Sequence, residues 1–288
     1  MASLADLATP VVMGILLGGL YALIALGLSL VFGVMRLINV AHGDLVVLGT
    51  YFAYAALSFF HVDPILSLIM GIPFLFAVGF IIQKYLMSRS FGVSMEAALI
   101  IAFGISLILQ NLNQILWTPL SRGLTTAYSV ESFSVGEVFI PYAYLFDFIA
   151  ALIVMVFLRT FLKRTYLGKA IVAASQNKRG ALLMGINTAR IYALTFGIAM
   201  ATAAVAGVFL GLTFPFSPTT GVAFLIISFG VIVIGGLGSM IGTFIGGMVI
   251  GLAQTLGGHF FGDAAQMLIA YIIVLVALSI RPQGIFGR

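Results

Sequence analysis

The nine residues Arg-Leu-Ile-Asn-Val-Ala-His-Gly-Asp at positions 36–44 separate two apolar runs. Residues 11–35 on one side and 45–60 on the other contain no charged side chain. Polar groups in such a place are costly unless they face water, protein or a cavity. The stretch therefore predicts an interrupted membrane helix, and such interruptions are where membrane transport proteins bind their solutes.

The composition around this break is that of an integral membrane protein. Of the 288 residues, 62% are hydrophobic and only 7% are charged, whereas soluble domains carry about 25% charged residues. The formal net charge of +5 does not form a soluble basic face, so we expect no nucleic-acid partner. We predict an all-α polytopic protein with residues 1–288 in a single transmembrane domain.

Apolar segments are long enough to predict eight or nine membrane-spanning helices, including short or broken ones. A spanning helix needs about 20 mostly apolar residues, and the second and seventh segments are shorter than that. The segments are residues 10–35, 44–60, 64–87, 95–117, 141–161, 190–213, 221–237, 239–259 and 264–280.

Glycines recur at a spacing of four, as in the pairs Gly14 and Gly18, and Gly207 and Gly211. A missing side chain every fourth residue lets two helix backbones approach closely. We expect tight packing within the chain, with a subunit interface as the alternative.

The distribution of basic residues predicts the orientation in the membrane. Lysines and arginines crowd residues 159–190, which contain no acidic residue, so this loop is expected on the cytoplasmic side. The nine-helix arrangement then places the N-terminus outside and the C-terminus inside. Residues 118–140 become an outer loop, which we expect to be irregular and which either receives an extracytoplasmic partner or is a connector.

The basic loop, residues 160–189, has the pattern of a helical hairpin. Residues 168–176 favour helix, Asn177 can cap a second helix over residues 178–184, and Gly185 suits the left-handed position that follows. Its apolar residues can enter a groove on a soluble partner or lie on the membrane surface. The candidate coupling residues are Gly168, Ala173, Ala174, Asn177, Ala181, Met184, Gly185 and Ile186.

Polar residues inside the predicted helices are candidates for the solute path. We expect Arg36 and Asp44 to neutralise each other, which favours a structural role over direct substrate binding. The buried carboxyl of Asp147 needs a partner, for which Arg122 is one possibility. The path candidates are Asn39, His42, Asp44, Gln110, Asn111, Asn113 and Asp147, with Gln254 a weaker one.

The sequence does not predict an enzyme. A nucleotide-binding P-loop needs Gly-Lys followed by Ser or Thr, but Gly168-Lys169 is followed by Ala170. The three histidines are far apart in sequence, so no metal site is expected. Energy must come from another subunit or an ion gradient, unless the chain is a channel or a scaffold that moves no solute.

Several stretches resemble the LivH-type permeases of the branched-chain amino acid ABC importers (the LivH/LivM family). Residues 33–44 are similar to the first signature of that family, and residues 233–243 and 281–287 are similar to its C-terminal motifs. Residues 168–190 look like the loop by which ABC permeases contact their ATPase. These motifs are shared with urea and short-amide permeases, and the similarity covers nearly the whole chain.

The resemblance implies a permease subunit in a bacterial or archaeal inner membrane. Its implied partners are a second permease subunit (LivM-like, or a second copy of this chain), two cytoplasmic ATPases and an extracytoplasmic substrate-binding protein. ATP and Mg²⁺ would be bound by the ATPase subunits, with no cofactor in this chain. The implied substrates are branched-chain or related amino acids, with urea or short amides as the alternative.

Overall fold

The computed structural model describes residues 4–90, 94–136, 138–281 and 284–286. Within these residues, eight helical stretches are long and apolar enough to cross a membrane, and the shorter α10 has 16 residues, which confirms the all-α polytopic fold. The helices are α1 Leu4–Met35, α2 His42–Phe60, α3 Leu68–Ile81, η1 Ile82–Leu86 (a π-helical turn), η2 Met87–Ser90, α4 Met95–Trp117, α5 Ala127–Val130, α6 Tyr142–Arg164, α7 Tyr166–Gln176, α8 Lys178–Leu183, α9 Thr188–Thr213, α10 Thr220–Gly235, α11 Met240–Phe261, η3 Asp263–Ala265 and α12 Gln266–Ile280; the strands are β1 Ser132–Val135 and β2 Val138–Pro141.

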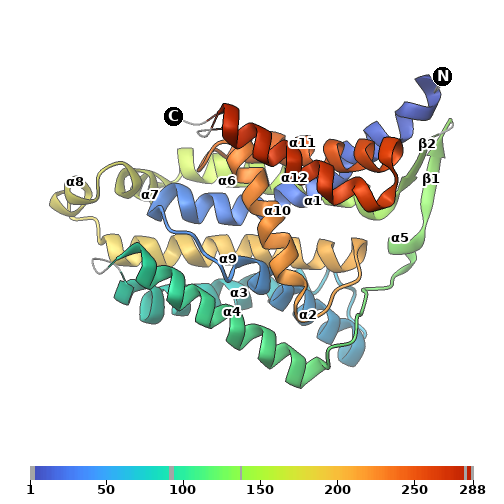
Figure 1. Ribbon diagram of the computed structural model, residues 1–288. Coiled ribbons are helices and arrows are strands. Elements are labelled where there is room, and N and C mark those ends of the chain that lie inside the picture. Colours follow the sequence, from blue (N-terminus) through green and yellow to red (C-terminus); the bar gives the residue numbers. More distant parts are fainter. Residues whose placement is uncertain (1–3, 91–93, 137, 282–283, 287–288) are drawn as a thin grey trace.

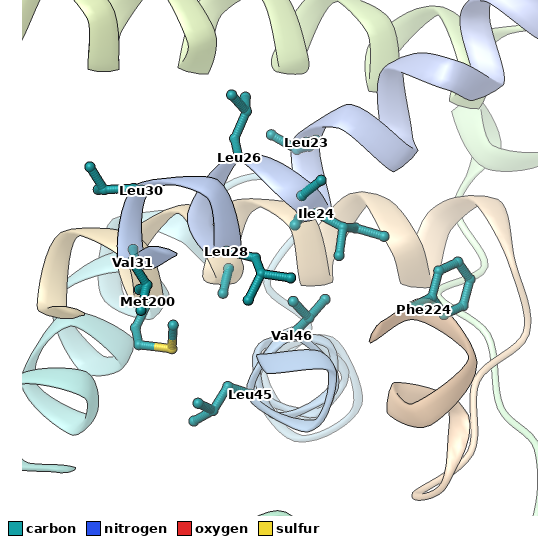
Figure 2. Close-up of a cluster of buried hydrophobic side chains, with 14 of the residues drawn as sticks. Leu23, Ile24, Leu26, Leu28, Leu30, Val31, Leu45, Val46, Met200 and Phe224 are labelled. Atoms are coloured by element: carbon teal, nitrogen blue, oxygen red, sulfur yellow. The ribbon is translucent and has the colours of Figure 1, made fainter. Parts of the chain in front are cut away.

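Two long helices, α1 and α9, form the centre of the bundle and lie beside each other in Figure 1. In the most apolar part of each helix, 89% of α1 and 78% of α9 is buried by protein. The corresponding value is only 6% for the stretch that contains α12. A helix that is apolar on all sides is stable only when surrounded by protein or lipid. Figure 2 shows Leu28 of α1, Val46 of α2 and Phe224 of α10 in the same buried cluster.

The helices on either side of this centre repeat one arrangement in opposite directions. In each half a central helix, α1 or α9, is followed by a turn of six residues (36–41 or 214–219) and by a helix that begins inside the bundle, α2 or α10. The next helix packs on the central helix of the other half: α3 on α9, and α11 on α1. Because α1 and α9 run in opposite directions (Figure 1), the chain has the inverted repeat found in many transport proteins.

Glycines make these central contacts possible. A β-carbon on Gly18 of α1 would meet the backbone of Met248, and one on Gly247 of α11 would meet Ala22. Gly207 of α9 likewise faces the backbone of α2. The glycines at spacing four in α1 and α9 are thus used for packing within the chain, as expected from the sequence.

The bundle has two different ends. At one end α7 and α8 extend beyond the other helices on the side of the C-terminus, and at the other end the β1–β2 hairpin lies near the N-terminus (Figure 1). The hairpin pairs Ser132 with Pro141 and Val135 with Val138. The expectation of an irregular segment at residues 118–140 is therefore correct for residues 118–126 and wrong for the part that follows, where a short helix and two paired strands form. The two termini lie at opposite ends, as the nine-helix arrangement requires.

Candidate functional site

The polar stretch at residues 36–44 is the turn that leads from α1 back into the bundle. Arg36 ends α1 in a left-handed conformation, with φ of 52°, and its side chain is exposed. The chain then turns inward, and α2 begins at His42. The imidazole Nε2 of His42 lies 2.8 Å from the carbonyl oxygen of Ile24, near the middle of α1. Thus α2 begins halfway along α1, inside the bundle. The unpaired backbone groups of a helix end are tolerated there only because protein surrounds them.

The N-terminal ends of α2 and α10 meet at this depth. Gly43 and Gly221 lie so close together that a β-carbon on either one would overlap the backbone of the other. Each of these glycines is the second residue of its helix, in the same position within its half of the repeat. We call the first turns of both helices, residues 42–44 and 220–222, with Ser106 and Gln110 of α4, the interior junction.

Asp44 is the charged residue of the interior junction and is only 2% exposed. The hydroxyl of Ser106 donates to its Oδ2 at 2.5 Å, and Nε2 of Gln110 donates to its Oδ1 at 3.1 Å. The expected pairing of Asp44 with Arg36 is wrong, because Arg36 stays at the exposed end of α1 while the turn carries Asp44 inward. The partners of Asp44 come from α4 instead.

The position of Asp44 also has an electrostatic explanation. It lies in the first turn of α2 and against Gly221 in the first turn of α10. Helix N-termini carry a partial positive charge and favour a carboxylate. Two such ends and two hydrogen-bond donors therefore compensate an acidic group that is buried in the bundle.

The remaining amide candidates are divided between several environments. Asn39 and Asn113 are buried, and Nδ2 of each lacks a hydrogen-bond partner among the described residues. Asn111 is exposed and donates from Nδ2 to the carbonyl of Leu107 in its own helix at 2.8 Å. The amides of α4 therefore do not form one cluster: Gln110 belongs to the interior junction, whereas Asn111 faces away from the bundle.

Asp147 lies in a second buried polar site, on α6. Its Oδ2 accepts a hydrogen bond of 2.8 Å from the hydroxyl of Thr213, and its Oδ1 has no partner within the part of the chain that the structure describes. The suggested partner Arg122 donates instead to the hydroxyl of Tyr54 and the carbonyl of Trp117, each at 2.6 Å. That suggestion was wrong, because Arg122 belongs to the loop after α4 that pairs with Phe216.

Gln254 is also paired with a residue that the sequence did not single out. Its Oε1 accepts a hydrogen bond of 2.5 Å from the hydroxyl of Tyr21, across the contact between α11 and α1. Helical spacing alone could not show this pairing, because the two residues are far apart in the chain.

The segment at residues 160–189 folds into the expected helical hairpin. Asn177 caps α8, with its Oδ1 accepting from the amide of Gly180 at 2.9 Å. Gly185 has φ of 78°, and the amide of Ile186 donates to the carbonyl of Ala181 at 3.0 Å, which is a Schellman ending. Asn187 then caps α9 through the amide of Arg190 at 3.0 Å.

The tip of this hairpin is apolar and exposed. Leu183 and Met184 are 89% and 82% exposed, and Leu182 is 51% exposed. By contrast, the candidates Gly168, Ala174 and Ala181 are buried and hold the hairpin together. The sequence analysis selected Met184 but not Leu182 or Leu183, although their position between a helix cap and Gly185 was a usable signal.

A cavity of about 390 Å³ lies apart from these polar groups, between α3, α6 and α9. It is lined by apolar side chains, among them Ile72, Phe157 and Val205, and by Thr202. The hydroxyl of Thr202 already donates to the carbonyl of Ala199 at 2.7 Å. The cavity thus has little to offer a charged solute.

An inverted helical repeat with a buried polar junction and a protruding helical hairpin defines a polytopic membrane protein of the permease type. Residues 11–278 match the family model described as branched-chain amino acid transport system / permease component. The chain belongs to this family.

The sequences of individual relatives are similar to this chain over nearly its whole length. The chain is 32% identical to BraD of Pseudomonas aeruginosa, a high-affinity branched-chain amino acid transport system permease protein, over 96% of this chain and 94% of BraD. It is also 32% identical to LivH of Salmonella typhimurium, with the same coverage. The solved structure of PsaBC from Streptococcus pneumoniae in complex with Fab is similar in fold, with a TM-score of 0.50 and 13% identity over 95% of this chain and 92% of that one.

Proposed function

We propose that the chain is a pore-forming permease subunit of an ATP-driven importer for branched-chain or related amino acids. It would work with a second permease subunit or a second copy, two cytoplasmic ATPases that bind ATP and Mg²⁺, and an extracytoplasmic binding protein. The feature that carries the proposal is the exposed apolar tip of Leu183 and Met184 on an otherwise basic hairpin. A chain that drove transport by itself would not need such a tip in water.

The hairpin supports this role through both its shape and its charge. It extends from the end of the bundle that carries the C-terminus (Figure 1). Apolar side chains at the centre of a contact surrounded by charged residues are the usual anatomy of a protein interface. The packing of Gly168 against the backbone of Phe161 joins the hairpin closely to α6, so that movement at the tip can reach the membrane helices.

The interior junction supports a role in solute passage. An amino acid carries an ammonium and a carboxylate, and the junction holds a carboxylate, an amide and two helix N-termini. Helix N-termini inside membrane transport proteins interact with carboxylates of their substrates. In our proposal Asp44 and Gln110 contact the solute briefly, after a movement that separates Gly43 from Gly221.

We propose leucine-like amino acids as substrates and not urea or short amides. The reason is that the named relatives are branched-chain amino acid permeases. An ion-coupled transporter or channel remains the competing function. Asp44, or Asp147 with its hydrogen bond from Thr213, would be its coupling residue.

Reconstitution into liposomes distinguishes these functions. The complete complex, with its cognate ATPases, second permease subunit and binding protein, should take up radiolabelled leucine only when ATP is present. Unlabelled isoleucine and valine should compete, whereas urea and acetamide should not. Uptake by this chain alone, driven by a proton or sodium gradient, would contradict the proposal.

A further inference from the structure

A small cavity of about 80 Å³, lined mainly by residues with polar side chains, lies where the end of α3 meets the helical hairpin and the start of α9. It is larger than the roughly 10–15 Å³ that one water molecule requires. Its walls come from three separate parts of the chain. They are Gln83, Ser88, Lys178, Thr188, Ala189 and Tyr192.

Gln83 is the unusual member of this cavity. It lies in the π-helical turn η1 and is only 1% exposed, yet neither its Nε2 nor its Oε1 has a hydrogen-bond partner among the residues that the structure describes. A buried amide without partners costs about 1–3 kcal/mol for each group left unsatisfied. Native proteins therefore rarely contain a buried amide that lacks hydrogen bonds. A group in the cavity that both accepts and donates hydrogen bonds would satisfy this amide.

The charged side chain that lines the cavity is basic. Lys178 lines it and also lies with its Nζ 6.0 Å from the centre of the Tyr192 ring. Thr188 and Ala189 belong to the first turn of α9, a helix of 26 residues. The N-terminus of a long helix favours anions, and phosphate groups bind such ends readily.

We infer that this cavity is a binding site for a phosphate group, provided by a phospholipid headgroup or by free inorganic phosphate. The ammonium of Lys178 and Nε2 of Gln83 would donate to phosphate oxygens, beside the first turn of α9. Oε1 of Gln83 would accept from a hydroxyl of the headgroup or of the protonated phosphate. The ligand would join the end of α3 to the hairpin, independently of any ATPase.

The experiment uses the full-length chain purified in detergent, with the bound lipids detected by native mass spectrometry. Phosphatidylglycerol is offered in competition with glucosyl diacylglycerol, which has no phosphate. In parallel, the unfolding temperature is followed with sodium phosphate and with sodium chloride at matched ionic strength. If phosphatidylglycerol is retained and phosphate does not change the unfolding temperature, the ligand is a lipid. If the unfolding temperature rises with phosphate but not with chloride, the ligand is the free ion.

Two variants locate the site. Lys178→Gln removes the charge, and Gln83→Leu removes the amide with a side chain of similar size. Each should weaken binding of the phosphate ligand roughly tenfold, the effect of losing one charge-assisted hydrogen bond. Lys163→Gln is the matched control, because Lys163 is an exposed lysine on α6 outside the cavity and should bind as the wild type does.

The inference is overturned if neither phosphatidylglycerol nor phosphate binds selectively, since the cavity would then hold only water. It is also overturned if Lys163→Gln weakens binding as much as Lys178→Gln does. Gln83→Leu keeps the test decisive if Lys178→Gln does not fold. With a water-filled cavity, Gln83→Leu should raise the unfolding temperature and leave lipid retention unchanged.

Discussion

Gly43 of α2 and Gly221 of α10 are in backbone contact where the two helices begin inside the bundle. The two residues occupy the same position in the two halves of the inverted repeat, and Asp44 lies directly beside the contact. The two helix ends can be this close only because neither residue has a side chain.

Gly43→Ala should therefore destabilise the protein by about 1–3 kcal/mol, as expected for an added methyl group in a packed interior. Gly104→Ala is the control, since Gly104 is also within a helix, but among the described residues no atom beyond its chain neighbours and the adjacent backbone of its own helix lies within 4 Å of the place its β-carbon would take. That change should be neutral or stabilise by up to about 1 kcal/mol. The unfolding of both variants in detergent checks this, and equal stability would mean that the interior junction is loosely packed.

A double change at the hairpin tip, Leu183→Ser with Met184→Ser, should separate ATP hydrolysis from transport. The two side chains are exposed, so the chain should fold and insert normally, while leucine uptake by the complete complex should fall at least roughly tenfold, as for loss of interface anchor residues. Uptake and ATP hydrolysis are measured on the same proteoliposomes.

Leu120→Ser is the matched control for the tip, because Leu120 is 68% exposed in the loop after α4. It should leave coupling intact. If the tip variant still showed ATP hydrolysis that responds fully to substrate, the hairpin would not be the contact with the ATPase. Ala174 is a poor choice for this test, since it is 2% exposed and a larger side chain there would disturb packing instead.

Thr213→Val should destabilise the protein by about 1–3 kcal/mol, because it leaves the buried carboxyl of Asp147 without its hydroxyl donor. Asp147→Asn should be milder, since a neutral amide still accepts the bond from Thr213. Denaturation of both variants in detergent gives the comparison. A greater loss of stability in Asp147→Asn would show that the carboxylate has another partner, such as a bound cation.

Tyr128, in α5, provides a pH-dependent prediction. Burial, together with the hydrogen bond of 2.8 Å to Asp63, raises the pKa of Tyr128 from 10.0 to about 12. Because the folded-state pKa is raised, the stabilisation is complete below pH 10 and is lost as the pH rises through about 12. The tyrosinate absorbance of the wild type minus that of Tyr128→Phe should therefore titrate near pH 12, and a midpoint near 10 would contradict the contact.

Much of the fold was predictable because membrane helices are specified by local composition. The apolar segments, the interrupted stretch at residues 36–44 and the caps at Asn177 and Gly185 all depend on neighbouring residues. The hairpin of β1 and β2 was missed because its strands are only four residues each and lie in a polar loop. Such short strands give little periodicity to recognise.

The partners of buried polar groups were less predictable, because they join distant parts of the chain. Asp44 was expected to pair with Arg36, in the same short stretch, but it is held by Ser106 and Gln110 of α4. Likewise, Asp147 is paired with Thr213 and not with Arg122. The contacts of Asp44 follow from the return of α2 into the bundle, and that of Asp147 follows from the packing of α6 against α9. Neither arrangement is encoded in the pattern of a single helix.

The inward position of the two helix starts also constrains how the protein is made. A translocon releases helices into lipid in order, but the first turn of α10 has no place in lipid, because its backbone groups would have no partners there. It can settle only against α2, which was synthesised much earlier, and α2 must wait with its own first turn uncovered until then. Biogenesis of this chain is therefore cooperative across its whole length, and a truncation before residue 220 should be degraded rather than accumulate as a stable half.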